Sequence, residues 1–283
     1  MKSLPRLLLT SCLSLATFTT GVAADAPLAL THVNLVDVVE QNVVADQTVL
    51  IEGERITAIL PAGEWPGGGD HVEVDLAGKY LIPGLIDAHV HMATDPERED
   101  RESLALRRLR QLVRGGVTSV RDMGGDVRTL ADLKRRAEIG VISSPDIYYS
   151  VILAGRAFFA DPRTVSSAKG RRSGDVDWMR AVNDDTDFDE VVLRAQGTGA
   201  TGLKIYADVT PTQVEQVVGA ARRHDMPVWS HAYHRAAAPS EIAAAGVDVM
   251  SHAAYLAAEV VDDFYRLHRG GQPLTQEELD ASL

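Results

Sequence analysis

The 283-residue chain has only one cysteine, Cys12, and aromatic residues make up only 5% of it. Cys12 lies in an N-terminal stretch that carries Lys2 and Arg6, then a short apolar run, then small residues up to Ala24. This order predicts a secretory signal peptide over residues 1–24, cleaved after Ala24. The mature chain would then have no thiol, which excludes a disulfide, a catalytic thiolate and a cysteine-ligated metal. Any metal site must therefore use histidine and carboxylate.

Long apolar runs and basic charge are also scarce. The apolar run before Cys12 is too short and too interrupted for a membrane span. The sequence Leu9-Thr-Ser-Cys12 also resembles a bacterial lipoprotein box, which would leave a lipidated Cys12, but the run before it is very short for one. We therefore expect a periplasmic or secreted protein without a transmembrane span. The net charge of −12 argues against nucleic acid or an anionic membrane as a partner.

The rest of the chain shows two patterns of predicted secondary structure. Over residues 28–60, short stretches of β-branched alternation predict strands, and the turn Glu52-Gly53-Glu54 predicts a hairpin between the last two. From Leu81 onward, strands alternate with helices, which indicates an α/β fold with a parallel sheet. We predict strands at 81–92, 117–123, 146–155, 202–208, 226–232 and 247–256.

Helix signals fall between these strands. Leu106, Leu109 and Val113 form one apolar stripe that stops at Gly115, and further helices are predicted over 129–139 and 187–196. The helix after the fourth strand opens with a capping box, Thr210 to Gln213, and its stripe consists of Val214, Val217, Val218 and Ala221. Residues 156–186 predict an irregular insertion that is long enough to be a functional loop.

Polar residues gather where these strands end. His89 and His91 occupy alternate positions of the first strand, so their rings point to the same side. Lys204 lies in the fourth strand, His231 ends the fifth and His252 ends the sixth. In a parallel β/α barrel the carboxyl ends of the strands carry the chemistry. Because imidazole is the commonest metal ligand, the rim is a candidate metal site.

Each of these residues also has a simpler interpretation. A single strand histidine is usually a hydrogen-bonded structural residue, and a single lysine usually snorkels or forms an ion pair. Lys204, however, lies in an apolar stretch where a buried ammonium is costly. Either a carboxylate partner or conversion to a carbamate by CO₂ would remove that cost. The four convergent histidines favour the carbamate, an anion that can bridge two cations.

Five segments resemble the amidohydrolase superfamily of metal-dependent hydrolases, in particular its imidazolonepropionase-like and Xaa-Pro-dipeptidase-like branch. They are "PGLIDAHVH", "GVTSVRD", "GATGLKIYAD", "PVWSHA" and "AGVDVMSHA". The resemblance implies a (β/α)8 TIM barrel, of which residues 81–283 supply strands 1–6. It also implies that residues 25–80 form part of an N-terminal β-sandwich domain.

The resemblance further implies a binuclear site. His89 and His91 would bind one ion, a carboxylated Lys204 would bridge two divalent ions, usually zinc, and His231 and His252 would bind the second. A metal-activated water would then cleave the amide or peptide bond of a small-molecule or dipeptide-like substrate. A homo-oligomer is compatible with this assignment. A periplasmic location favours the hydrolysis of peptide or xenobiotic amides over the imidazolonepropionase reaction itself.

The chain departs from the family at its catalytic aspartate. The family places this proton-shuttling residue at the end of strand eight, but only 31 residues follow His252. Asp262 and Asp263 precede any seventh strand, and a capping box at Thr275 and Glu278 is followed by about one turn of helix. No catalytic residue is therefore identifiable, and the expected aspartate lies beyond Leu283. We expect a C-terminally truncated member. The alternatives are a catalytically inactive metal-binding fragment or scaffold, and a barrel without metal.

Three residues near the ligands are candidate substrate contacts. Tyr206 and Tyr233 follow Lys204 and His231 closely and could hydrogen-bond a substrate carboxylate, although a structural role is equally compatible with their positions. His234 could contact substrate or be a solvated loop residue. In the insertion 156–186, we expect Arg171, Arg172 and Trp178 to cover the pocket.

Overall fold

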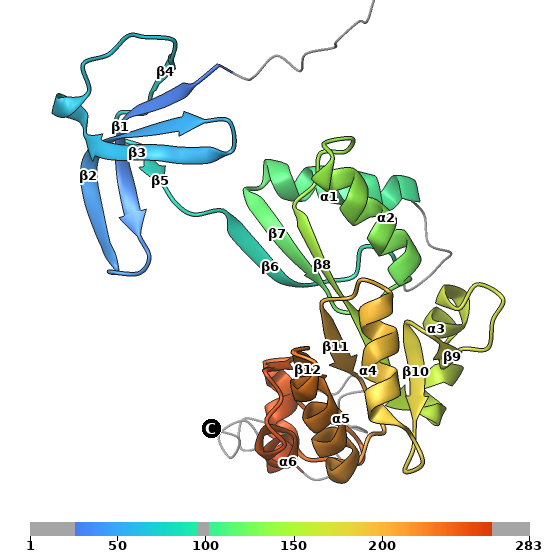
Figure 1. The fold of residues 1–283 in the computed structure, drawn as a ribbon. Helices are drawn as coiled ribbons and strands as arrows, with labels where there is room; N and C mark the ends of the chain where they lie inside the picture. The colour runs from blue at the N-terminus through green and yellow to red at the C-terminus, as the bar shows by residue number, and fades with distance from the viewer. Residues whose placement is uncertain (1–25, 95–101, 262–283) are drawn as a thin grey trace, which may run out of the picture. The chain divides into compact units, whose positions relative to one another are not determined.

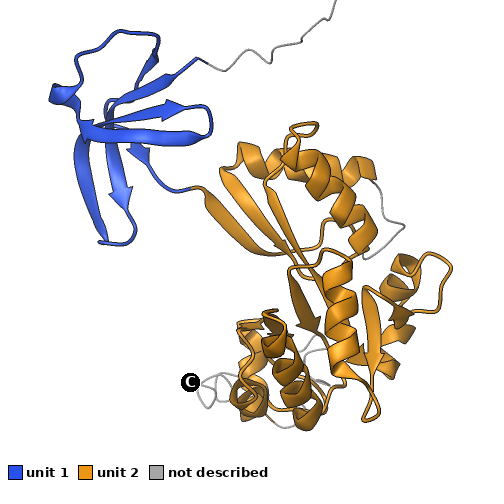
Figure 2. Cartoon of the chain, viewed as in Figure 1, with its two compact units in different colours: residues 1–83 blue, residues 84–283 orange. Residues whose placement is uncertain are grey.

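The computed structural model describes residues 26–94 and 102–261. The predicted signal peptide, Asp262, Asp263 and the capping box at Thr275 lie outside the described residues. The chain divides into two compact units, residues 1–83 and 84–283 (Figure 2).

The first unit is a small sheet with the order β3-β2-β1-β4, in which β5 also pairs with β1. Its strands are β1 Leu28–Asp37, β2 Asn42–Glu52, β3 Arg55–Pro61, β4 Val72–Asp75 and β5 Tyr80–Leu81, with a 3₁₀ turn, η1, at Ala62–Glu64. The predicted hairpin is confirmed, because Glu52 pairs with Arg55 across the turn. Gly53 adopts a φ of +58°, which glycine tolerates without strain.

The second unit contains the predicted strand–helix alternation (Figure 1). Six strands run parallel in the order β6-β7-β8-β11-β12-β13. They are β6 Leu85–Val90, β7 Val117–Asp122, β8 Asp146–Gly155, β11 Gly202–Ile205, β12 Val228–His231 and β13 Val249–Ser251. The sheet curls into a partial TIM barrel. Within the described chain, β6 pairs only with β7 and β13 only with β12, so the wall is open at both ends.

The helices pack on the strands, and of the stripe predicted at Leu106, Leu109 and Val113, Leu109 is buried whereas Val113 is 38% exposed. They are α1 Glu102–Arg114, α2 Val127–Glu138, α4 Phe188–Gly197, α5 Pro211–Arg223 and α6 Pro239–Ala244, followed by the 3₁₀ segment η3 Ala253–Glu259. The capping box of α5 is present in both directions between Thr210 and Gln213. Its predicted stripe is buried, because each of those side chains is at most 3% exposed. Burial of this stripe fixes α5 against the sheet.

The insertion 156–186 is not irregular, so that prediction was wrong. It forms η2 Arg156–Ala160, α3 Pro162–Ser167, β9 Asp175–Val176 and β10 Met179–Val182. The reason lies in β8, which pairs with β7 only over its first half, from Asp146 to Tyr149. The same strand's second half would have one unpaired edge, and β10 pairs with it in parallel from Ile152 to Gly155.

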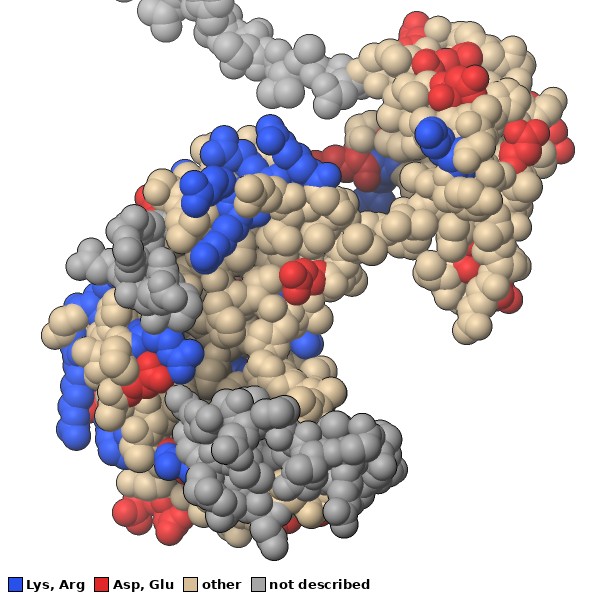
Figure 3. All heavy atoms as spheres, turned by 180° about the vertical axis from the view of Figure 1, so that it is seen from behind, with Lys and Arg blue, Asp and Glu red and all other residues tan. Residues whose placement is uncertain are grey.

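Charge is unevenly distributed on the second unit. Basic side chains gather in the region of α1 and α2 (Figure 3), and α1 alone carries Arg107, Arg108, Arg110 and Arg114. Acidic partners are interspersed, since Arg136 pairs with Glu102 and Asp132. None of the helices in the described part of the chain is long and apolar enough to cross a bilayer.

Candidate metal centre

The structure brings the four predicted histidines together at one end of the parallel sheet. The ring centroids of His89 and His91 lie 5.4 Å apart. His252 lies 4.7 Å from His89 and 4.7 Å from His231. His89 is near the end of β6, and His252 follows β13 in a left-handed conformation with φ +66°. Curling of the sheet therefore joins ligand candidates from its first and last strands.

Lys204 lies in β11, within electrostatic reach of His89 and His231. Its side chain is fully buried, and its Nζ has no hydrogen-bond partner among the described residues. Burial, and secondly the charge of Arg121, lowers the pKa of Lys204 to about 6. A carboxylate partner is one of the two features predicted to remove the cost of burying the Lys204 ammonium. In the described part of the chain, no carboxylate pairs with Lys204.

Two of the rings, those of His89 and His231, are held in their neutral form. Burial, followed by Lys204 and the neighbouring histidines, lowers the pKa of His89 to about 4. The same causes lower the pKa of His231 still further. A neutral ring keeps a lone pair for a ligand. Across residues 26–94 and 102–261, no three His, Cys, Asp or Glu side chains are placed so that they could hold a metal ion as they stand.

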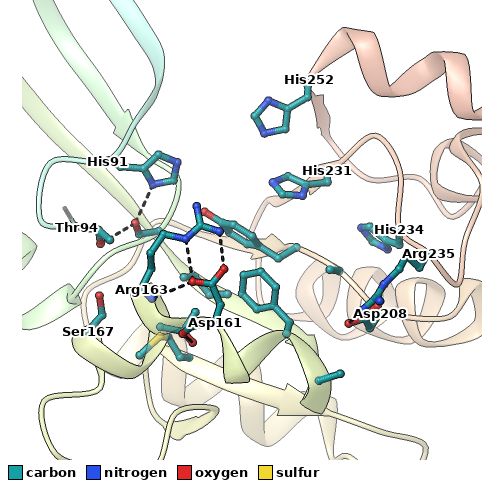
Figure 4. A pocket seen from close by; sticks show the side chains of 18 of the residues that line it. His91, Thr94, Asp161, Arg163, Ser167, Asp208, His231, His234, Arg235 and His252 are labelled. Atoms are coloured by element: carbon teal, nitrogen blue, oxygen red, sulfur yellow. Dashed lines mark hydrogen bonds and ion pairs between the residues drawn. The ribbon is translucent and has the colours of Figure 1, made fainter. Parts of the chain in front are cut away.

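His91 has the hydrogen bond that a metal ligand needs on its other nitrogen. Its Nδ1 lies 2.9 Å from the carbonyl oxygen of Gly124, to which it can only donate (Figure 4). This bond selects the tautomer whose Nε2 lone pair is free for a metal. Thr94 Oγ1 donates to the same carbonyl at 3.3 Å.

Asp122 supports this arrangement and was missed from the sequence. It ends β7, is fully buried, and accepts the backbone N–H groups of Met92 at 2.5 Å and Gly124 at 3.0 Å. Burial raises its pKa, while His91 and the backbone donors oppose that rise. The carboxylate ties the segment after β6 to the end of β7, and so it orients His91. The only signal in the sequence is an aspartate at a strand end two residues before Gly124-Gly125.

The predicted substrate contacts differ in what occupies their polar atoms. The Tyr206 hydroxyl donates to the Met123 carbonyl at 2.9 Å, and the ring lies 4.5 Å from that of His231. Tyr233 lines the pocket. His234 is only 1% exposed, with its Nε2 3.0 Å from Ser230 Oγ, and burial lowers its pKa to about 4. The solvated-loop interpretation of His234 is therefore wrong.

A cavity of about 720 Å³ opens beside the histidines. His91, His231 and His252 line it, together with side chains that the insertion supplies, namely Ala157, Phe158, Asp161, Arg163, Thr164, Ser167 and Met179. The insertion thus borders the pocket, but not through the predicted residues. Arg171 and Arg172 do not line it, and Trp178 is buried beneath the guanidinium of Arg128 at 4.2 Å.

Both carboxylates on this cavity wall are engaged by arginine. Asp161 receives the Nε and Nη2 of Arg163 at 2.9 and 2.7 Å. Asp208 receives the same two atoms of Arg235 at 2.8 and 2.7 Å. Neither carboxylate is therefore placed as a general base in this part of the chain.

The fold and the strand-end cluster define a β/α-barrel protein with a candidate metal centre at the carboxyl ends of its strands. The chain belongs to the amidohydrolase family, whose model matches residues 80–268.

Relatives extend this assignment over shorter or more distant matches. The imidazolonepropionase of Arthrobacter sp. is 45% identical over 53 residues, which cover 19% of this chain and 13% of that protein. A Xaa-Pro dipeptidase with bound methionine superposes with a TM-score of 0.66 and 22% identity, covering 90% of this chain and 64% of that one. The A. niger ochratoxinase superposes with a TM-score of 0.62 and 16% identity, covering 91% of this chain and 70% of that one. At these identities the superpositions establish the fold. The chain spans less than two thirds of the dipeptidase and a small part of the imidazolonepropionase.

Proposed function

We propose that this chain carries the metal centre of a hydrolase that cleaves an amide or peptide C–N bond through a metal-activated water. The observation that carries the proposal is Lys204, a fully buried amine without a hydrogen-bond partner among the described residues, within electrostatic reach of His89 and His231. A barrel without metal would gain nothing from this arrangement.

The donor set fits two divalent ions, of which zinc is the best match for imidazole ligands. His89 and His91 would hold one ion, His231 and His252 the other, and modified Lys204 would join them. Ions bound there supply a Lewis acid and a water of lowered pKa. The chain's own contribution is orientation: Gly124 fixes the His91 ring, and Asp122 fixes the segment that carries it.

Lys204 would serve as a ligand after reaction with CO₂. Its neutral Nζ would form a bond to the carbon of CO₂ and release one proton, giving a carbamate with one negative charge. Arg121 supports this step, because its positive charge acts on Lys204 and would favour an anion there. The Nε of Arg121 is held at 2.9 Å from the Ala88 carbonyl, which keeps the guanidinium on this strand.

The substrate we propose is a small or dipeptide-like amide. A cavity of about 720 Å³ is of the size that holds ligands of this class. Relatives named imidazolonepropionase and Xaa-Pro dipeptidase support the reaction type. Tyr233 lines the cavity wall and is a candidate contact for the substrate. We further propose that the mature enzyme acts in the periplasm or is secreted.

A second function, a metal-binding protein without catalysis, is favoured by one observation. The two carboxylates of the described cavity wall, Asp161 and Asp208, are both paired with arginine, so neither can accept the water's proton.

Two measurements separate these functions. Elemental analysis of the purified chain should find up to two divalent ions per molecule, and a metal-free result would refute both functions. A panel of dipeptides and N-acyl amino acids then tests hydrolysis. Turnover that disappears in a His91→Asn variant would establish the hydrolase, whereas bound metal without turnover would favour the non-catalytic function.

A further inference from the structure

The same helix-capping arrangement, an aspartate N-cap that binds an arginine two residues later, occurs at the N-termini of α2 and α3. The sequences are Asp126-Val-Arg-Thr and Asp161-Pro-Arg-Thr. At α2, Asp126 accepts the backbone N–H of Arg128 at 3.0 Å and its Nε and Nη2 at 2.9 and 2.8 Å. At α3, Asp161 accepts the corresponding groups of Arg163 at 2.9, 2.9 and 2.7 Å. Each aspartate therefore fixes a guanidinium plane two residues later.

The two guanidinium groups face different surroundings. Arg128 covers the ring of buried Trp178 at 4.2 Å and does not line the cavity, so its role in packing is accounted for. Arg163 lines the cavity, and its charge reaches Tyr206 and Tyr255. The rings of both tyrosines contact that of His231. Arg163 thus presents a guanidinium, paired with Asp161 and fixed in orientation, on the wall of the cavity that the histidines also line.

Ser167 provides a second, independent observation on the same wall. It lies four residues after Arg163 on α3, so it occupies the same helix face one turn later. It lines the cavity and is only 3% exposed, yet its Oγ has no hydrogen-bond partner within the described residues. A buried hydroxyl in this state is costly unless a bound group satisfies it.

Figure 4 shows Arg163 and Asp161 with Thr94 and Ser167 on one side of the pocket, and His231, His234 and Arg235 on the other. We propose that Arg163 and Ser167 form a subsite for a carboxylate of the substrate. The subsite rests on the proposed function for its role in catalysis, and it selects anionic amides such as N-acyl amino acids and dipeptides.

The chemistry of the pair favours a carboxylate over other groups. Asp161 uses the Nε and Nη2 donors of Arg163, and the Nη1 donors remain for a ligand. A guanidinium held in one orientation loses little entropy when it binds a second carboxylate. A cationic substituent would offer no acceptor to the Nη1 donors, and a neutral amide would forgo the charge-assisted bond.

Binding to the metal-free full-length chain tests the subsite apart from the metal. The chain is treated with a chelator, and the probes are N-acetyl-L-alanine and its amide, which differ only in the charged group. Ligand-detected NMR titration at millimolar concentrations gives both affinities. We expect the acid to bind about tenfold more tightly than the amide, as a charge-assisted hydrogen bond implies. Arg163→Gln should remove that preference, and Ser167→Ala should reduce it.

Arg128→Gln is the matched control, because it removes the same cap arginine outside the cavity. Thermal unfolding of each variant establishes that it is folded, and Arg163→Lys, which keeps the charge, should retain part of the preference. Equal affinity for acid and amide, or absence of binding by both, overturns the proposal. So does a preference that survives Arg163→Gln or is removed by Arg235→Gln instead. Metal content is measured separately, so a chain without metal would refute the proposed function and leave this result interpretable.

Discussion

The rings of His89 and His252 lie 4.7 Å apart, although they stand on β6 and β13, at opposite ends of the six-stranded parallel wall. Their sequence separation is large, and no hydrogen-bonded ladder of the described chain joins their strands directly. The contact exists because the sheet curls, so that side chains at the carboxyl ends of its first and last strands face one another. The candidate metal centre therefore depends on the curl of the open wall.

Substitution of either histidine should weaken metal binding in the same way. We expect His89→Asn and His252→Asn each to reduce zinc affinity by at least about tenfold, and the double variant to lose less than the sum, because the two act on one centre. Isothermal titration with zinc gives the affinities. The control is His224→Asn, since His224 pairs with Asp189 away from the cluster. Additive losses in the double variant would contradict a shared centre.

Replacement of Lys204 should separate folding from metal binding. Lys204→Met keeps the volume of the side chain but removes a buried amine whose contact in the described structure is the Tyr206 ring, 5.6 Å away, and which has no hydrogen-bond partner there. We expect the free energy of unfolding of the metal-free chain to rise by about 1–3 kcal/mol, and metal binding to fall. Urea denaturation and elemental analysis measure the two effects. A destabilised metal-free variant would indicate that Lys204 has a stabilising partner.

Gly124 should be intolerant of a side chain because of its position beside His91. Its φ is +149°, and an added Cβ would lie 2.8 Å from both Ile152 and the Tyr206 hydroxyl. We expect Gly124→Ala to cost about 3 kcal/mol of stability and to weaken zinc binding, because the carbonyl that orients His91 must move. Gly116→Ala is the control: its φ is +85°, with nothing within 4 Å of the added atom. The control should cost about 1 kcal/mol and leave zinc affinity unchanged.

Buried His234 should make stability fall in mild acid. Its pKa is about 4 in the folded chain against 6.5 for an unperturbed histidine, so the unfolded chain takes up the proton first. The stabilising contribution is complete above pH 6.5 and is lost as the pH falls toward 4. We expect His234→Gln to reduce this pH dependence by on the order of 1–3 kcal/mol. Denaturation of the metal-free chain at pH 7 and pH 4.5 measures it. An unchanged slope would mean that His234 is protonated or exposed in the native state.

Local patterns predicted the elements well where a single physical rule decides them. The Thr210 capping box and the stripe behind it depend only on nearby backbone and on helical periodicity, and both are present. The prediction of an irregular insertion at 156–186 failed because its structure depends on a contact with another strand, which local patterns do not show. Its strand β10 exists because β8 has an unpaired half, and that vacancy is set by a partner distant in sequence.

The same division applies to the site. Strand-end positions predicted that His89, His91, Lys204, His231 and His252 would share one rim, because parallel strands bring their carboxyl ends to one edge. The sequence did not reveal that Asp122 would hold the His91 segment, or that His234 would be buried against Ser230. Both depend on which backbone groups the folded loops place beside them.

By itself, then, the sequence determined the residue types and their order along the strands, since alternation and spacing follow from local backbone geometry. Only the tertiary structure decided what each one meets. The curl of the sheet brought His89 to His252, and burial left Lys204 without a hydrogen-bond partner among the described residues. The roles of the two similar caps also differ only in the fold, because Arg128 packs on Trp178 while Arg163 lines the cavity. Sequence fixes neither burial nor long-range proximity, because both arise from packing between distant segments.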